Sequence, residues 1–271
     1  MSLRRVNILD LNFSHASYST DYQLSKFIAW ERSSSHTNNG DNFFATDRSM
    51  FNANGDRCVG WIMEPPSISP EVYNYSLNNS GNYKTILTYD RDLLDSGGNF
   101  RFYPHSGCWI KPEDFKIYQK TKELSIIASA KNQTAGHRLR HDIIKDYGPI
   151  LDVYGRGYRE IPYKLEALKD YRFSIVIENI SKDYYFTEKL IDCLVTGTIP
   201  IYYGCPSISK FFNPEGFIMI NDRSSIEVGI RTATVNFYEK NIKVIRENFE
   251  AAKEYLIAED WIFNNHPDLF E

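Results

Sequence analysis

Residues 171–222, YRFSIVIENISKDYYFTEKLIDCLVTGTIPIYYGCPSISKFFNPEGFIMIND, decide the fold of this chain. The stretch begins with an apolar, strand-like run, FSIVIE, which is followed by the polar loop NISKDYY. A helix then starts at Thr187-Glu188-Lys189, and a second buried-strand pattern, TIPIYYG, comes after it. A strand, a crossover helix and a second strand make one parallel βαβ unit. Ligands of such sheets bind at the carboxyl ends of the strands, beside helix N-termini, so we expect a site there.

The start of this helix carries charges that packing alone does not explain. Thr187 is a typical N-cap residue, and Glu188 is favoured in the first turn by the helix dipole. Lys189 is disfavoured at the same place, because its positive charge opposes the dipole. A helix N-terminus attracts phosphate through its unpaired N–H groups. A bound diphosphate would remove the conflict at Lys189, so the pattern predicts a site for a sugar diphosphate.

A second βαβ unit precedes the first along the chain. The strand LSIIAS, the loop AKNQTAG, the helix HRLRHDIIKDYG and the strand ILDVYG follow one another over residues 124–155. Successive βαβ units imply a parallel sheet with helices on both faces. Arg138, at the start of the helix, can bind two phosphate oxygens at once, whereas we expect Arg140 on the solvated surface. Tyr154 begins a glycine-rich turn, where the backbone can approach a base or a ribose closely.

The rest of the chain is expected to form a first α/β domain, residues 1–120, ahead of a second domain, residues 121–271, with a helical tail. The expected strands span residues 6–11, 58–63 and 84–88, and the expected helices span residues 22–30, 69–77 and, with interruptions, 226–256. Residues 33–56 are rich in Ser, Asn, Gly and Asp and are expected to be mostly loop, with one short strand, FFAT.

Glu64 is the candidate general base of the first domain. It ends an apolar strand and is followed by Pro65-Pro66, and a proline pair stops a strand and stiffens the segment after it. A carboxylate at a partly dry strand end can have its pKa raised toward neutrality, where a base works best.

Composition excludes several classes of function. The formal net charge of −4 argues against a nucleic-acid or anionic-membrane partner. No apolar run approaches the roughly 20 residues of a membrane helix. The cysteines have no metal-binding spacing and are expected to be reduced, buried thiols of a cytoplasmic protein, or of one peripheral to the inner membrane face. These cysteines are Cys58, Cys108, Cys193 and Cys205.

The opening stretch also resembles the donor-site signature of the α-1,3/4-fucosyltransferases, glycosyltransferase family 10. That signature reads roughly F-E-N, a short polar loop, Y-x-T-E-K, an apolar helix, a small residue and P-[IV]-[IV/Y]-x-G-x-P. This chain has IEN at residues 177–179, YFTEK at 185–189 and TIPIYYG at 198–204, followed by Pro206. The signature is long and ordered, which makes it far more specific than a lone glycine motif.

The resemblance implies a GT-B fold, in which two Rossmann-like domains face each other across the cleft that holds the active site. It implies an inverting transfer of fucose from GDP-fucose to a glycan hydroxyl. In that reaction Arg138 and Lys189 would bind the donor's diphosphate, Glu188 would bind donor hydroxyls, and Tyr185 would contact the nucleotide.

The resemblance also bears on Glu178 and Asn179, on Glu64 and on the segment Asp90-Arg91-Asp92. Glu178 and Asn179 are candidate donor ligands. The family carries Glu-Ser-Pro or a related form where this chain has Glu64-Pro65-Pro66, which implies Glu64 as the catalytic base. Asp90-Arg91-Asp92 looks like the DxD metal motif of other glycosyltransferases, but its position matches a Tyr-Arg-Arg-Asp segment of the family. Because two cations serve the diphosphate, we expect no required cofactor and a divalent metal that is at most stimulatory.

Two other functions stay open at this point. One is a glycosyltransferase of the same fold that uses another nucleotide-linked sugar. The other is a non-catalytic module that binds a nucleotide sugar or a glycan. The expected partners are in each case small molecules or glycans, and no nucleic acid.

Overall fold

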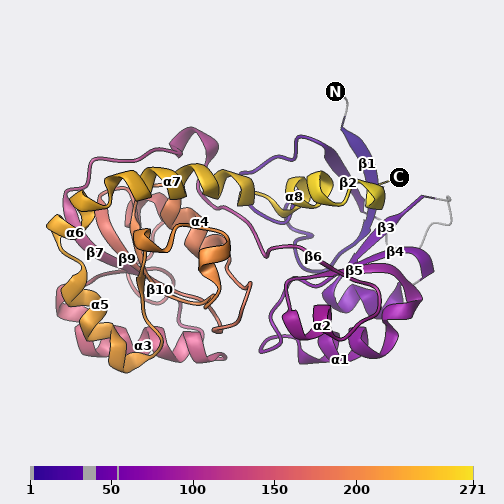
Figure 1. The fold of residues 1–271 in the computed structure, drawn as a ribbon, viewed down its shortest axis with the longest axis horizontal. Helices are drawn as coiled ribbons and strands as arrows, with labels where there is room; N and C mark the ends of the chain where they lie inside the picture. The colour runs from indigo at the N-terminus through magenta and orange to yellow at the C-terminus, as the bar shows by residue number, and fades with distance from the viewer. Residues whose placement is uncertain (1–2, 33–40, 54, 271) are drawn as a thin grey trace. The chain divides into compact units, whose positions relative to one another are not determined.

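The structure is a computed structural model that describes residues 3–32, 41–53 and 55–270. The chain divides into two compact units, each with its own parallel sheet (Figure 1). Unit 1 comprises Met1–Gly107 and Ile257–Glu271, and unit 2 comprises Cys108–Leu256. The expected boundary near Lys120 therefore lies inside unit 2, and the end of the chain belongs to unit 1 instead of the second domain.

Unit 1 is built on a six-stranded sheet with the order β2-β1-β3-β4-β5-β6, in which all neighbours are parallel. Its strands are β1 Arg4–Leu9, β2 Ile28–Arg32, β3 Phe43–Thr46, β4 Gly55–Trp61, β5 Tyr83–Thr88 and β6 Phe100–Phe102. Its helices are α1 Pro70–Asn79, α2 Arg91–Asp95 and α8 Ala258–Asn265. The short strand FFAT, the helix near residues 69–77 and the strands near residues 6–11, 58–63 and 84–88 are confirmed, with shifted bounds. The loop expected over residues 33–56 falls partly on residues 33–40 and 54, outside the described residues.

The helix expected over residues 22–30 is wrong, because this segment ends in strand β2. The tail of the chain explains the difference. Glu259, on α8, is fully buried and accepts hydrogen bonds from Ser19 N–H (2.7 Å) and the Trp30 indole (3.0 Å). The next residue, Asp260, accepts from the backbone N–H of Lys26 (3.1 Å). The backbone N–H of Lys26, which a helix over residues 22–30 would have used internally, is thus bound to a carboxylate 234 residues away in sequence, which local spacing does not reveal.

Unit 2 carries a five-stranded parallel sheet with the order β11-β10-β9-β7-β8. Its strands are β7 Lys122–Ile127, β8 Asp152–Tyr154, β9 Tyr171–Ile177, β10 Ile199–Tyr203 and β11 Ile218–Met219. Its helices are α3 Ala135–Tyr147, α4 Glu188–Leu194, α5 Ile226–Thr232, α6 Val235–Lys240 and α7 Ile242–Ala252. Both expected βαβ units, β7-α3-β8 and β9-α4-β10, are confirmed. The helical pattern over residues 226–256 is three helices and a final short turn.

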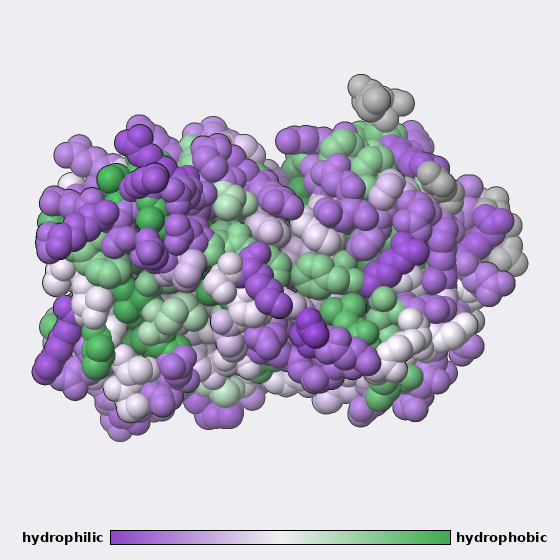
Figure 2. Space-filling view, viewed as in Figure 1, coloured by the Kyte–Doolittle hydropathy of each residue, from purple (hydrophilic) through white to green (hydrophobic). Residues whose placement is uncertain are grey.

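The direction in which successive strands are added to the sheet reverses between β7 and β9, although the strands themselves are parallel. From β7 the sheet grows one way to β8, and from β9 it grows the other way to β10 and β11. Because crossovers are right-handed, α3 and α4 lie on opposite faces of the sheet (Figure 1). Helix α7 lies on the same side as α4 and buries Val244, Ile245 and Asn248, and the surface over it is largely hydrophilic (Figure 2). Such a reversal leaves a crevice at the carboxyl ends of β7 and β9, where ligands of open α/β sheets bind.

Candidate functional site

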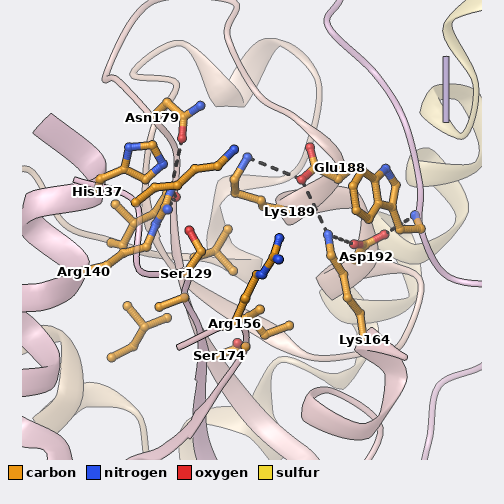
Figure 3. Close-up of a pocket in the computed structure, with 18 of the residues that line it drawn as sticks. Ser129, His137, Arg140, Arg156, Lys164, Ser174, Asn179, Glu188, Lys189 and Asp192 are labelled. Carbon is orange, nitrogen blue, oxygen red and sulfur yellow. Dashed lines mark hydrogen bonds and ion pairs between the residues drawn. The ribbon is translucent and has the colours of Figure 1, made fainter. Parts of the chain in front are cut away.

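A pocket of about 410 Å³ lies at this reversal, in the range usual for small-molecule sites. The end of β7 contributes Ile127, and the segment after β9 contributes Asn179. Helix α3 adds Arg140, and α4 adds Lys189 (Figure 3). Other polar side chains on its wall are Ser129, Lys131, His137, Arg156, Lys164, Ser174, Glu188 and Asp192. All of these residues belong to unit 2.

The start of α4 is tied to the end of β9 by one buried carboxylate. Glu178 is fully buried, and its two oxygens accept from the backbone N–H (2.9 Å) and the hydroxyl (2.7 Å) of Thr187. Thr187 in turn caps α4 by accepting from Lys189 N–H, which confirms its predicted capping role. The Lys189 ammonium lies 3.4 Å from Glu178. Glu178 therefore holds the helix start and Lys189 in place, and it is not among the described residues that line the pocket.

Glu188 lies on the pocket wall between two ammonium groups. Its carboxylate is 3.4 Å from the Lys189 ammonium and 3.5 Å from that of Lys164 (Figure 3). The carboxylate is thus flanked by two opposite charges. An ionised carboxylate on a pocket wall is an acceptor for ligand hydroxyl groups.

Helix α3 approaches the end of β9 very closely. A Cβ atom at Gly136 would lie 1.8 Å from the carbonyl oxygen of Glu178, so only glycine fits there. Arg140 follows Gly136 by four residues and therefore shares its helix face. Its guanidinium is buried and donates to the carbonyl of Ile177 (2.7 Å) and to the Asn179 side-chain oxygen (3.2 Å).

The expectation that Arg140 is a solvated surface residue is therefore wrong. Arg138, two residues earlier, points the other way. It is exposed and donates one long hydrogen bond to the carbonyl of Gln133 (3.5 Å). Among the residues that the structure describes, those lining the pocket do not include Arg138.

Two aromatic candidates also lie away from the pocket wall. Tyr154 is buried and its hydroxyl is 2.6 Å from that of Tyr171, inside a small core cluster. Tyr185 is likewise buried, in the segment before α4. Of the predicted donor-binding residues, the structure thus brings Asn179, Glu188 and Lys189 together at the pocket.

Several lining residues were missed by sequence reasoning. Arg156 could have been predicted, because it lies in the glycine-rich turn after β8. Its guanidinium projects into the pocket (Figure 3). Lys164, Asp192 and Trp109 gave no signal, since each looks like an ordinary surface or core residue in the sequence.

Glu64 lies in unit 1, three residues beyond the end of β4. Its backbone N–H donates to the carboxylate of Asp47 (3.2 Å), and its carbonyl accepts from the Tyr73 hydroxyl (3.0 Å). Asp47 also accepts from Met63 N–H (2.8 Å), and burial raises the pKa of Asp47 to about 7. Asp47 has a left-handed backbone, φ 35°, which is uncommon outside glycine and is found preferentially at functional sites. The half-buried Glu64 is therefore held at its backbone from two sides.

Other predictions concern cysteines, metal and membrane. All four cysteines are buried and free, as expected.

Asp90 caps α2 by accepting from the N–H groups of Asp92 and Leu93, which gives the DxD-like segment a structural role. Across residues 3–32, 41–53 and 55–270, no group of three or more His, Cys, Asp or Glu residues is placed to hold a metal. Within the same ranges, no helix has the length and apolarity needed to cross a bilayer.

His137 predicts a pH dependence of stability. Burial, and after it the charges of Arg140, Lys131, Lys189 and His141, lower the pKa of its imidazole to about 4. Its Nδ1 also accepts the backbone N–H of Thr134, which a protonated ring could not do. An unfolded histidine titrates near 6.5, so the unfolded chain binds more protons between pH 6.5 and 4. The free energy of unfolding should fall by about 3 kcal/mol across this window.

The substitution His137→Gln tests this pH dependence. Glutamine at this position retains the capping box with Thr134 but does not titrate. Chemical denaturation at pH 7, 5.5 and 4.5 should give a shallower loss of stability for the variant than for the wild type. Parallel pH profiles would show that His137 does not carry the effect.

Comparisons with known proteins agree with this architecture. A family model described as Glycosyltransferase family 10 (fucosyltransferase) C-term matches residues 117–264. Alpha-(1,3)-fucosyltransferase FucT of Helicobacter pylori is 40% identical over 74 residues, which are 27% of this chain and 15% of that protein. The 4-galactosyl-N-acetylglucosaminide 3-alpha-L-fucosyltransferase FUT6 of Pan troglodytes is 36% identical over 179 residues, 63% of this chain and 47% of that protein. The chain thus spans less than half the length of these curated relatives.

Solved structures show the same fold. A crystal structure of an alpha1,3-fucosyltransferase matches with a TM-score of 0.59 at 17% identity, covering 98% of this chain and 88% of that one. A structure of an alpha1,3-fucosyltransferase with GDP-fucose matches with a TM-score of 0.55 at 17% identity, covering 94% and 92%. With the two parallel α/β sheets, these matches confirm the expected class, two Rossmann-like domains of GT-B type.

Proposed function

This chain belongs to glycosyltransferase family 10, and on that premise we propose that it transfers fucose from GDP-fucose to a hydroxyl group of a glycan. The observation that carries the proposal is the pocket at the reversal of the unit 2 sheet, where Lys189, Glu188 and Asn179 meet. These are the residues of the donor-site signature, and they lie where α/β sheets bind nucleotides.

In this proposal the diphosphate binds to cations. Lys189 lies on the pocket wall and contributes its ammonium. Arg138 is exposed at the first turn of α3, and its weak contact with Gln133 leaves its side chain able to turn toward a phosphate. Arg140 has a different task, because its guanidinium is already bound to the end of β9 and to Asn179. The carboxylate of Glu188 accepts hydroxyl groups of the donor.

We further propose an inverting reaction by a single displacement. The acceptor oxygen forms a bond to the anomeric carbon of fucose while the bond from that carbon to the diphosphate oxygen breaks. Glu64 takes the proton of the acceptor hydroxyl, and GDP leaves with the bonding electron pair. One displacement inverts the anomeric centre, so one base suffices and no covalent intermediate with the protein forms.

A transfer assay tests the function. The protein is incubated with labelled GDP-fucose and a glycan array, with and without EDTA, and labelled glycans are identified together with their linkage and anomeric configuration. We expect transfer with inversion that persists in EDTA. Transfer from another sugar nucleotide in place of GDP-fucose would contradict the donor assignment. Donor binding without turnover on any glycan would favour a binding module.

Arg138→Ala and Arg140→Ala form a matched pair on one helix. The Arg138 variant should raise the KM for GDP-fucose about tenfold, the cost of one charge-assisted hydrogen bond, with an unchanged melting temperature. The Arg140 variant should lower the melting temperature, because it leaves the buried carbonyl of Ile177 without this donor. Steady-state kinetics and thermal denaturation separate the two effects. An Arg138 variant with wild-type KM would remove Arg138 from the proposal.

A further inference from the structure

The ammonium of Lys164 contacts two carboxylates of α4, those of Glu188 and Asp192. The donor-site signature does not relate these two carboxylates to each other. It begins a short 3₁₀ turn, Lys164–Ala167, and lines the pocket. Its ammonium lies 2.8 Å from the Asp192 carboxylate and 3.5 Å from that of Glu188 (Figure 3). Glu188 and Asp192 are four residues apart, so they share one face of α4 and would repel each other. Lys164 supplies the positive charge between them.

The partner of Lys164 is deeply buried and fixed. Asp192 is 1% exposed, and its second oxygen accepts the backbone N–H of Trp109 at 2.6 Å. Burial raises the pKa of Asp192, while the nearby Lys164 acts to lower it. Burial also opposes the charge on Lys164, but Asp192 and Glu188 outweigh it and raise the pKa of Lys164 above its usual value. Asp192, fixed by Trp109, therefore anchors the Lys164 ammonium.

An aromatic ring covers the other side of this ammonium. Lys164 Nζ lies 4.4 Å from the centre of the Trp109 ring, a cation–π distance, and Trp109 itself lines the pocket. The ammonium is thus held by Asp192 and Trp109 and faces the pocket at Glu188. On its other side Glu188 meets Lys189, so charges alternate along the wall in the order Lys189, Glu188, Lys164, Asp192.

We propose that Lys164 is a positioning residue for Glu188, holding this carboxylate in the orientation in which it can accept hydroxyl groups of the bound nucleotide sugar. This inference rests on the proposed function and deepens it, since it names the residue that orients the hydroxyl-binding carboxylate of the pocket. Without Lys164, Glu188 faces Asp192 with one ammonium fewer, and its hydrogen bonds to the ligand weaken. The hydroxyls could belong to the ribose or to fucose, both of which carry the same chemistry.

The test is a double-mutant cycle on donor affinity. Lys164→Met alone leaves a buried unpaired carboxylate and could unfold the protein, so it is made together with Asp192→Asn, whose amide oxygen can still accept from Trp109. This pair is combined with Glu188→Gln, and calorimetry measures the dissociation constants of GDP-fucose and GDP. Lys243→Met, an 88% exposed lysine side chain on α7, is the matched control, and Lys164→Arg is the conservative variant.

We expect the Lys164/Asp192 change to raise the dissociation constant for GDP-fucose about tenfold, with kcat within about twofold of wild type. In the Glu188→Gln background the same change should have less than a twofold effect, because Lys164 acts through Glu188. Lys164→Arg should restore affinity to within about threefold. An equal loss for GDP would assign the hydroxyls to the ribose, and a loss confined to GDP-fucose would assign them to fucose; both support the proposal.

Two results would overturn the inference alone. In the first, the Lys164→Met/Asp192→Asn change weakens GDP-fucose binding equally in the wild-type and the Glu188→Gln backgrounds. In the second, the folded Lys164→Met/Asp192→Asn variant binds GDP-fucose with wild-type affinity. In either case wild-type protein still binds GDP-fucose, and the proposed function stands. If wild-type protein binds no GDP-fucose, the proposed function fails, and the inference fails with it.

Discussion

Glu64→Gln should lower kcat for fucose transfer by about 10²–10⁴-fold, the usual contribution of a general base, with little change in the affinity for GDP-fucose. Glutamine has the size of glutamate but accepts no proton at neutral pH. The bonds that hold residue 64 run from its backbone to Asp47 and Tyr73, so the substitution leaves them in place. The donor is proposed to bind through unit 2 residues, which this change does not touch.

Initial rates and calorimetric titrations on the same preparation measure the two quantities separately. Glu71→Gln is the control, because Glu71 is another carboxylate of unit 1 and forms an exposed ion pair with Arg48. The control should keep its rate. A Glu64 variant that retains more than about a tenth of the wild-type kcat would exclude Glu64 as the base.

Lys189→Met should lower kcat/KM by about 10²–10³-fold, with effects on both kcat and donor binding. The ammonium would stabilise the diphosphate as its charge grows in the transition state, which makes the contact stronger there than in the ground state. Methionine keeps most of the side-chain volume and removes the charge. Because Lys189 also lies 3.4 Å from the buried Glu178, the variant should melt at a lower temperature as well.

Lys210→Met is the control for the loss of one positive charge away from the pocket wall. Lys210 is an exposed lysine of unit 2 that contacts the Tyr184 hydroxyl. It should keep wild-type kinetics. Lys189→Arg should recover part of the lost rate, as arginine retains the charge in a different shape. A Lys189 variant with wild-type kcat/KM would contradict the proposed role even if its stability falls.

Local signals in the sequence predicted much of unit 2. The cap at Thr187, the apolar runs of β9 and β10 and the crossover between them lie within 33 residues of one another, and each is readable from its neighbours. The two successive βαβ units also predicted a parallel sheet with helices on both faces, but they did not predict the order of its strands. The sequence predicted a site at the carboxyl ends of the strands, beside the start of α4, and the pocket lies there.

Contacts between distant segments were not predictable in the same way. Residues 28–32 became a strand because β1 pairs with them and Glu259 binds the segment before them. Arg140 is buried and Arg138 is exposed because Arg140 shares the helix face of Gly136, which packs against the end of β9. The spacing of four residues is readable in the sequence, but no local signal marks Gly136 as the point of contact with β9. Lys164 is the extreme case, as its two partners lie 24 and 28 residues away on another element.

Calorimetric titration of the wild-type protein and the Lys189→Met variant with GDP-fucose and UDP-glucose tests the central claim most directly. The proposed donor site predicts one GDP-fucose bound per chain, at least about tenfold weaker binding of UDP-glucose, and a large loss of GDP-fucose affinity in the variant. Equal affinity of the wild-type protein for the two sugar nucleotides would contradict it. So would a Lys189→Met variant that binds GDP-fucose with wild-type affinity.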